Sequence, residues 1–503
     1  MGDVQHNCGV LGIYSKTKNY PIGLMLHEGQ KHLENRGKDS HGGTFVSDGR
    51  LVSRRQHGVV PFYCKDSIFN GLVGSSGIGH NRYGTVGPGG DDYRQPLDER
   101  ASFGDFSFAH NGTIYNSAAL ARRLFSEGKT FSTGRVLDES GNWTGKYNFD
   151  FISDSEVIGK LIAQKDDIVE GIRYASEQIL GGYSLVLLTD RGDLYAVRDS
   201  RGLKPLCIGR NSQAVGVFSE SCVFSSLDLM MEFERYVQPG EIFHAGRDGE
   251  ETFELPDKEK VPYSLDIFEI VYFANSASVI DGIPVSLFRE FGGMALGRKN
   301  PEDKNRGFVT VPVEFSGIDW AQGFARETGN PYTSWVRRQR YSGRAFISPD
   351  DATRQKEARQ KLVLLESNIG RYPDGYLVDD SIVRGHTARK LINRLRLAGA
   401  RQIHARIGFP PVIDICPWGG VDMKTPDEHI ANQYRDLEER RKHLGLDSLI
   451  YNEPSDLIWA ANEARNFARV NMPRYHFESN GALELSNFCT HCITRINPFG
   501  EQK

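Results

Sequence analysis

One segment, residues 375–408, limits the fold more than any other, because it predicts a strand, a loop, a helix and a second strand in direct succession. The first strand is a short apolar run that ends in Asp379 and Asp380, and the helix is expected from about Ala388. Two strands joined through a helix usually run parallel in one sheet. Residues 306–329 repeat the order of strand, loop and helix, so we expect a parallel α/β domain in the second half of the chain.

The loop after that strand carries the clearest chemistry. Asp379 and Asp380 are expected at the carboxyl end of a parallel strand, the edge where open α/β sheets bind ligands. Backbone N–H groups of residues 381–387, together with the positive end of the next helix dipole, suit a phosphate. The two acids suit the vicinal hydroxyls of a sugar or a hydrated Mg2+. The segment predicts a 5-phosphoribosyl site, and a solvated strand end with an ordinary helix cap is the alternative.

The first half of the chain has a different pattern. Short apolar strands alternate with turns, and helical periodicity is limited to residues 155–164 and 168–180. This combination predicts an α+β arrangement of layers. A polar passage at residues 246–264 predicts a domain boundary near residues 258–261. The expected strands lie within residues 9–14, 43–55, 107–112 and 182–199.

Composition excludes several classes of partner. The 503 residues carry 61 Lys and Arg against 65 Asp and Glu, a net charge of -4, so we expect no binding to nucleic acid or to a membrane surface. The apolar runs are too short to cross a bilayer and the start lacks a signal-peptide pattern. These features favour a cytoplasmic protein with small-molecule substrates, and an odd count of seven cysteines argues against a disulfide framework.

The motif "LVDDSIVRGHT" resembles the signature of type I phosphoribosyltransferases, most closely the version in the glutamine phosphoribosylpyrophosphate amidotransferase family. The resemblance extends to "RQRYSGRAFISP", "FEIVYFANSASVIDGIPV" and "CPWGGVDM". It implies that Ser316, Asp379 and Asp380 hold Mg2+. The residues implied in phosphoribosylpyrophosphate binding are Asp379, Asp380, Ser381, Arg384, Gly385 and Thr387, with Arg340, Tyr341 and Arg344 from a closing loop.

Members of this family begin with an N-terminal-nucleophile glutaminase, and the resemblance implies that Cys8 is the nucleophile. In that class the α-amine of the nucleophile itself serves as the base for the thiol. Cys8 has such an amine only if the chain is cut after Asn7, so residues 1–7 are expected to be a propeptide. A packed strand cysteine is the alternative.

The partners of Cys8 come from four further motifs, "HNRYGTVG", "SDSE", "AHNGTIYN" and "ENRGKDSHGG". The resemblance implies that Arg82 and Asp154 bind the α-carboxylate and the α-amine of glutamine. It implies that the Asn111 side chain and the Gly112 N–H form an oxyanion hole. Arg36, in the last motif, is assigned to glutamine binding on the same ground.

The family pattern also implies the order of domains. We expect a propeptide at residues 1–7, an α+β N-terminal-nucleophile glutamine amidotransferase domain at 8–258, and an α/β type I phosphoribosyltransferase domain at 262–470. A C-terminal tail at 471–503 carries a Cys-x-x-Cys motif.

Four cysteines stand where one branch of the family holds a [4Fe-4S] cluster, and the resemblance implies that Cys222, Cys416, Cys489 and Cys492 are its ligands. A zinc site that includes His491 is one alternative. Ordinary surface cysteines are another.

The chain departs from the family pattern at a few positions. Glu314 and Phe315 replace a proline and an acid in the expected pyrophosphate loop, Asn275 replaces an arginine, and His386 stands where the signature has threonine. A segment at residues 131–150 is longer than usual and has no assigned role.

The resemblance implies the first step of purine synthesis, in which glutamine, phosphoribosylpyrophosphate and water give 5-phosphoribosylamine, glutamate and pyrophosphate. It further implies ammonia transfer through an internal passage, a homotetramer and feedback inhibition by purine nucleotides. One alternative is a divergent paralogue that aminates another phosphoribosyl acceptor. Another is a non-catalytic regulator that binds purine nucleotides and senses oxygen or iron.

Overall fold

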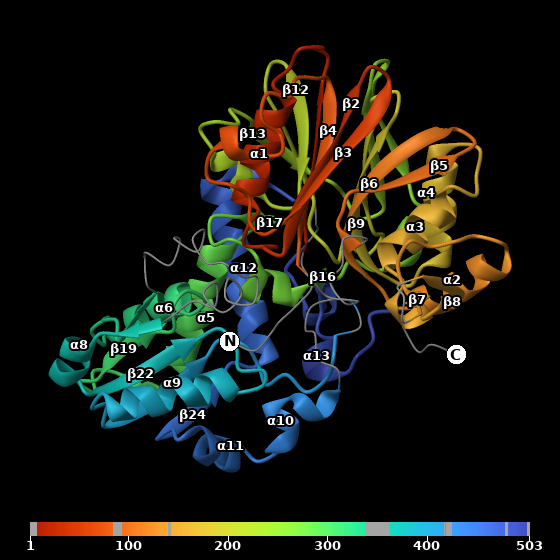
Figure 1. Cartoon of the computed structure of the whole chain (residues 1–503). Coiled ribbons are helices and arrows are strands. Elements are labelled where there is room, and N and C mark those ends of the chain that lie inside the picture. The colour runs from red at the N-terminus through yellow and green to blue at the C-terminus, as the bar shows by residue number, and fades with distance from the viewer. Residues whose placement is uncertain are drawn as a thin grey trace. The chain divides into compact units, whose positions relative to one another are not determined.

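The computed structural model describes residues 8–83, 93–138, 142–338, 362–416, 418, 425–477 and 481–499. It divides into two compact units, with the first division between Pro284 and Val285. The sandwich unit holds the described residues up to 284, those of 415–418 and those from 467 onward, and the parallel-sheet unit holds the rest (Figure 1). The domain limits expected from the sequence stay predictions. In the described ranges, no helix combines the length and apolar character that a bilayer span requires.

Two large antiparallel sheets form the body of the sandwich unit (Figure 1). Many of their strands follow one another through short turns, which join antiparallel neighbours. The seven-stranded sheet has the order β13 (Glu232–Tyr236), β11 (Cys207–Arg210), β12 (Ala214–Phe218), β1 (Gly9–Ser15), β4 (Ser76–Arg82), β2 (Ser40–Ser47) and β3 (Arg50–His57). The six-stranded sheet has the order β15 (Gly249–Glu254), β14 (Glu241–Gly246), β10 (Leu194–Arg198), β9 (Gly181–Thr189), β6 (Gly104–Ile114) and β5 (Leu97–Ala101).

The two sheets face each other across one apolar core. Val10 and Ile78 of the seven-stranded sheet share a cluster with Val186 and Leu194 of the six-stranded sheet. A Cβ on Gly12 would lie 2.6 Å from carbons of both Val186 and Leu194. Glycine at this position in β1 therefore allows the sheets to approach closely just beyond Cys8.

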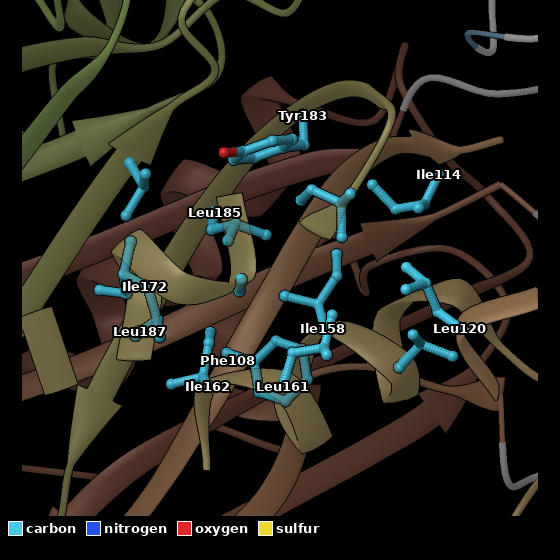
Figure 2. Close-up of a cluster of buried hydrophobic side chains, with 14 of the residues drawn as sticks. Phe108, Ile114, Leu120, Ile158, Leu161, Ile162, Ile172, Tyr183, Leu185 and Leu187 are labelled. Carbon is cyan, nitrogen blue, oxygen red and sulfur yellow. The ribbon is translucent and has the colours of Figure 1, made fainter. Parts of the chain in front are cut away.

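Helices cover the outer faces of both sheets. Helix α1 (Ile22–His32) packs on the seven-stranded sheet through a cluster that includes Leu11 and Leu26. The six-stranded sheet is covered by α2 (Ser117–Ser126), α3 (Asp154–Ile162) and α4 (Ile168–Gln178), and Figure 2 shows the side chains packed between them. This order of helix, sheet, sheet and helix confirms the expected α+β N-terminal-nucleophile sandwich.

Smaller elements complete the sandwich unit. The segment at 131–150 contains a hairpin, and Phe131 and Tyr147 at its base lie in the core beneath α3. Strand β16 pairs in parallel with β25 near the C-terminal end of the chain. The bounds are β7 (Arg135–Leu137), β8 (Trp143–Tyr147), β16 (Leu265–Asp266), β17 (Val279–Ile280), β18 (Ile283–Pro284), β25 (Phe488–Cys489) and α13 (His491–Thr494).

The parallel-sheet unit has four strands in chain order, all parallel: β19 (Val309–Pro312), β22 (Asp374–Asp379), β23 (Gln402–Ile407) and β24 (Ser448–Tyr451). This confirms the expected α/β domain. Short strands β20 (Val336–Arg338) and β21 (Leu362–Leu364) pair beside it. Its helices are α5 (Val285–Lys299), α6 (Ile318–Thr328), α8 (Glu366–Arg371), α9 (His386–Leu397), α10 (Ile430–Gln433), α11 (Leu437–Leu444) and α12 (Pro454–Asn471), the last of which crosses the division between units.

Helix α9 begins two residues earlier than the sequence predicts. Gly385 takes a left-handed backbone, with φ of 76°, and forms the N-cap, so that His386 is already the first helical residue. A Cβ on Gly385 would lie 2.4 Å from Ile430 Cδ1. Both the backbone angle and the space therefore require glycine here.

Candidate functional site

A pocket in the sandwich unit opens beside Cys8, which directly precedes the central strand β1. In β1, Gly9 is paired with Asn81 of β4, and β4 ends at Arg82. The residues that line the pocket are Cys8, Arg82, Tyr83, Tyr93, Gln95, His110, Gly112, Ser153, Asp154 and Ser155. The structure thus brings together Cys8, Arg82, Asp154 and Gly112, which lie far apart in the sequence.

The Cys8 thiol is held in its neutral form. Burial raises its pKa above the ordinary value, and this outweighs a backbone hydrogen bond from Tyr83 and the charges of Arg82 and Arg36. The Asp154 charge acts in the same direction as burial. Attack by this sulfur therefore needs a base close to it, which is the role expected of the α-amine.

Arg82 and Asp154 place opposite charges on the pocket wall. The Arg82 guanidinium lies 5.5 Å from the ring centroid of Tyr93. Asp154 is the first residue of α3, where its Oδ2 accepts a hydrogen bond from the Ile114 N–H at 3.2 Å. Because a free amino acid carries one positive and one negative group on its α-carbon, this pair suits the backbone end of glutamine.

Asn111 and Gly112 occupy adjacent positions on β6. The Asn111 side chain is fully buried, and its Oδ1 and Nδ2 have no hydrogen-bond partner among the described residues. Gly112 has φ of 144°, and a Cβ there would lie 2.0 Å from the Gly182 carbonyl oxygen, so only glycine fits. A buried amide without a partner is costly. Asn111 is not among the residues that line the pocket, whereas the adjacent Gly112 is.

His110 is a pocket residue that the sequence analysis missed. Its Nδ1 lies 3.0 Å from Ser155 Oγ, and its backbone N–H donates to Gln95 Oε1 at 2.8 Å. Burial lowers the pKa of His110, so the ring is neutral. The signal available was its place directly before Asn111 in "AHNG". Tyr93 and Gln95 belong to no motif and were also missed.

Arg36 lies behind the nucleophile and is not among the residues that line the pocket. Its Nε donates to the Cys8 carbonyl oxygen at 3.0 Å, and its Nη atoms donate to Glu220 and Glu269. This places Arg36 in direct contact with the Cys8 backbone.

The second candidate site lies at the carboxyl end of β22. Ser316 Oγ donates to Asp379 Oδ1 at 2.8 Å, and the Asp380 N–H donates to the same oxygen at 2.9 Å. Of the two carboxylate oxygens of Asp380, Oδ2 is buried and has no hydrogen-bond partner in the described part of the chain. Burial raises the pKa of Asp379, and burial together with the Asp379 charge raises that of Asp380. Two adjacent acids that are costly to ionise fit a divalent cation.

The loop after these acids is tightly held. Ser381 donates from its N–H and its Oγ to Asp380 Oδ1, at 2.5 and 3.2 Å. Arg384 pairs with Glu428 at 2.7 Å. Thr387 is the second residue of α9, next to the exposed His386. Residues 1–7 and the closing-loop residues Arg340, Tyr341 and Arg344 lie outside the described residues.

Three of the positions that depart from the family pattern also have defined surroundings. Glu314 is buried and its Oε1 lies 3.5 Å from Arg337, whereas the adjacent Phe315 is half exposed. Asn275 lies in the sandwich unit, where its N–H donates to Glu220 at 2.8 Å.

The four candidate cluster cysteines divide into two sets. Cys416, Cys489 and Cys492 interact with one another: burial raises the pKa of Cys489 and Cys492, and the Cys416 charge adds to the effect. Cys222 instead lies 3.6 Å from the His32 carbonyl oxygen and 4.0 Å from Glu220. In the described ranges no three His, Cys, Asp or Glu residues are arranged to hold a metal. As placed here, the cysteines do not fit a four-thiolate centre.

The two units together define a class of enzyme, an N-terminal-nucleophile glutamine amidotransferase joined to a type I phosphoribosyltransferase. Comparison with known proteins agrees. A family model described as a glutamine amidotransferase domain matches residues 140–226. The amidophosphoribosyltransferase of Methanothermobacter thermautotrophicus is 36% identical, covering 91% of each chain, and that of Methanocaldococcus jannaschii is 35% identical, covering 90% of this chain and 94% of its own.

A solved structure agrees over nearly the whole chain. The chain matches the glutamine phosphoribosylpyrophosphate amidotransferase of B. subtilis, in complex with ADP and GMP, with a TM-score of 0.78 at 28% identity, covering 98% of this chain and 97% of that one. The chain belongs to the amidophosphoribosyltransferase family.

Proposed function

We propose that this chain transfers the amide nitrogen of glutamine to phosphoribosylpyrophosphate and forms 5-phosphoribosylamine, the first step of purine biosynthesis. The observation that carries the proposal is the pocket in which Cys8 lies beside Arg82, Asp154 and Gly112. A second site with the acids of a phosphoribosyl-binding strand lies in the other unit. Family membership supports the same assignment.

The amide-cleaving half of the reaction follows from the pocket. Arg82 and Asp154 hold the α-carboxylate and α-amine of glutamine, which presents its amide carbonyl to Cys8. The α-amine of Cys8, freed by removal of residues 1–7, accepts the thiol proton. Asn111 Nδ2 and the Gly112 N–H stabilise the oxyanion of the tetrahedral intermediate. The protonated α-amine returns this proton to the leaving nitrogen as the C–N bond breaks, so that ammonia leaves. Water then hydrolyses the glutamyl thioester to glutamate and regenerates the Cys8 thiol.

The transferase half depends on position and charge. Asp379 and Asp380 bind the ribose hydroxyls and, with Ser316, are the residues that would hold Mg2+; the ion supplies charge neutralisation for pyrophosphate departure. Ser381, Arg384, Gly385 and Thr387 surround the 5-phosphate at the start of α9. Arg340, Tyr341 and Arg344, which lie outside the described residues, are assigned to phosphoribosylpyrophosphate binding by the resemblance alone. Ammonia then attacks C1 of the ribose as pyrophosphate leaves.

Regulation by purine nucleotides is part of the proposal, since the B. subtilis relative was solved with ADP and GMP. A homotetramer stays a prediction. The [4Fe-4S] cluster on Cys222, Cys416, Cys489 and Cys492 also stays a prediction, with zinc as its alternative, and the arrangement of the described cysteines does not support it. Iron, sulfide and zinc content of the purified protein decides between them.

The direct test is pyrophosphate release from phosphoribosylpyrophosphate, measured separately with glutamine and with ammonium salt. We expect both to support release, and mass spectrometry to find Cys8 as the first residue. Glutaminase activity without pyrophosphate release in either assay would instead favour a paralogue with another phosphoribosyl acceptor.

A further inference from the structure

Five buried charged side chains form a connected network in the sandwich unit, and one end of it contacts the backbone of Cys8. Arg36 Nε donates to the Cys8 carbonyl oxygen at 3.0 Å. Arg36 Nη1 lies 2.7 Å from Glu220 Oε1, and its Nη2 lies 3.0 Å from Glu269 Oε2. Lys204 continues the network, with its Nζ 3.3 Å from Glu269 and 2.9 Å from Asp266.

The network is closed to solvent. The side chains of Arg36, Glu220, Glu269 and Lys204 are all 0% exposed, and that of Asp266 is 6% exposed. The carboxylates hold both cations in their charged forms: although burial lowers the pKa of Arg36, Glu269 and Glu220 raise it above the ordinary value. Asp266 and Glu269 do the same for Lys204.

Stability alone does not account for such a network. Removing charges from water is expensive, and apolar residues of similar size often replace buried ion pairs without loss of stability. What the network does provide is orientation. A guanidinium is planar, so two carboxylates on its Nη atoms fix the direction of its remaining Nε–H donor. Here that donor is directed at the Cys8 carbonyl.

The orientation of this carbonyl matters because of where Cys8 stands. A nucleophile at the start of a mature chain has a peptide bond on one side only. Its carbonyl is therefore the nearest backbone group through which the protein can fix its amine and its sulfur. A shift of about 1 Å in a reacting group can lower a rate about 100-fold.

We propose that Glu269 and Lys204 are positioning residues for the amide-cleaving reaction: they hold Arg36, and Arg36 holds the Cys8 carbonyl. Neither side chain is among the residues that line the pocket. This inference rests on the proposed function. It gives a role to Glu269, which lies in the motif "FEIVYFANSASVIDGIPV" without an assigned role, and to Lys204, which lies in no motif.

Charge balance selects the informative variants. The network has two cations and three carboxylates, so Glu269→Gln leaves two of each and strands no buried charge. Asp266→Asn has the same balance but acts on Arg36 only through Lys204 and Glu269. A control with similar burial is Glu241→Gln, because Glu241 is 4% exposed and pairs with Arg235 in the same unit without contacting the network.

The experiment uses the full-length protein, with its N-terminus identified by mass spectrometry. Three rates are measured: glutamine hydrolysis, ammonia-dependent pyrophosphate release, and labelling of Cys8 by a chloroketone analogue of glutamine, followed by peptide mapping. For Glu269→Gln we expect kcat for glutamine and the labelling rate to fall about 30-fold, with KM within about threefold. In Asp266→Asn both rates should fall less than in Glu269→Gln. In Glu269→Asp both rates should lie between those of Glu269→Gln and wild type. Ammonia-dependent pyrophosphate release should match wild type in all of these variants. The Glu241→Gln control should match wild type in all three rates.

Wild-type labelling and kcat in Glu269→Gln would overturn the inference. An equal loss of glutamine-dependent and ammonia-dependent activity would overturn it too, because that outcome shows a general folding defect. A wild-type protein that releases no pyrophosphate would instead contradict the proposed function, and the labelling rates of Cys8 would still decide the role of Glu269.

Discussion

Asp154 accepts a hydrogen bond from the Ile114 N–H at 3.2 Å, and this contact ties the first turn of α3 to the end of β6. Strand β6 also carries Asn111 and Gly112. One contact therefore sets the separation between the residue assigned to the α-amine of glutamine and the groups assigned to the oxyanion. The residues assigned to the α-amine of glutamine and to its amide carbonyl are therefore held by the same two elements, α3 and β6.

Asp154→Asn should weaken glutamine binding. Loss of the negative charge would remove the partner proposed for the α-amine, so we expect KM for glutamine to rise by at least about tenfold, equivalent to about 1.4 kcal/mol. Ammonia-dependent pyrophosphate release should be unchanged. Steady-state assays of both activities check this, with the exposed Asp150→Asn as control. An unchanged KM would show that the amine binds elsewhere.

Asn111→Ala should affect the reaction rate more than binding. Removing one oxyanion donor typically costs about 100- to 1,000-fold in kcat. Because both amide atoms of Asn111 have no partner among the described residues, no internal hydrogen bond is lost, and the thermal midpoint should change little. Kinetics and calorimetry on the same sample test both statements. A large fall in the midpoint with normal kcat would assign Asn111 a structural role.

Asp380→Asn should separate the two half reactions in the opposite sense. The acid directly follows β22, and its loss would remove a residue proposed to bind Mg2+ and the ribose. We expect ammonia-dependent pyrophosphate release to fall at least about 100-fold while glutamine hydrolysis continues at a rate near that of wild type. Parallel assays with and without phosphoribosylpyrophosphate measure the two rates. Normal pyrophosphate release would remove Asp380 from the site.

His80 should make the sandwich unit sensitive to acid. Burial, then the Arg82 charge, lowers its pKa to about 3, whereas an unfolded histidine titrates near 6.5. The unfolded chain therefore binds the proton first as pH falls, and the contribution of neutral His80 is complete above about pH 6.5 and is lost toward pH 3. Between pH 7 and 5 the loss is about 2 kcal/mol.

The matching variant is His80→Gln, which does not titrate. Its free energy of unfolding should fall less than that of wild type over the same pH range, whatever its value at pH 7. Urea unfolding followed by tryptophan fluorescence at pH 7 and 5 gives both differences. Equal pH dependence in the two proteins would assign the acid sensitivity to other groups.

Local pattern was enough to predict much of the fold. Apolar alternation and turns gave the strands within residues 9–14 and 182–199, and helical periodicity gave α3, α4 and α9. The start of α9 was misplaced by two residues, because the N-cap depends on the left-handed backbone of Gly385, which the letter alone does not reveal. The hairpin at 131–150 was not predicted, since its pairing depends on aromatic contacts with a distant core.

The sites were predictable where a residue lies in a motif. Cys8, Arg82, Asp154 and Gly112, which the resemblance assigned to one reaction, line one pocket, and their individual roles stay predictions. Tyr93 and Gln95 could not be found, because they enter the pocket through the fold of a loop. The partners of Arg36 could not be found either, since Glu269 lies more than 200 positions away in the sequence. Buried charge pairing between distant segments leaves no local pattern.

The most direct test of the whole account is Cys8→Ala in the full-length protein, assayed with both nitrogen donors. The account predicts that glutamine-dependent pyrophosphate release falls to background while ammonium salt still supports release at the wild-type rate. Retained release with glutamine would contradict it, because no other sulfur lines the pocket in the described part of the chain.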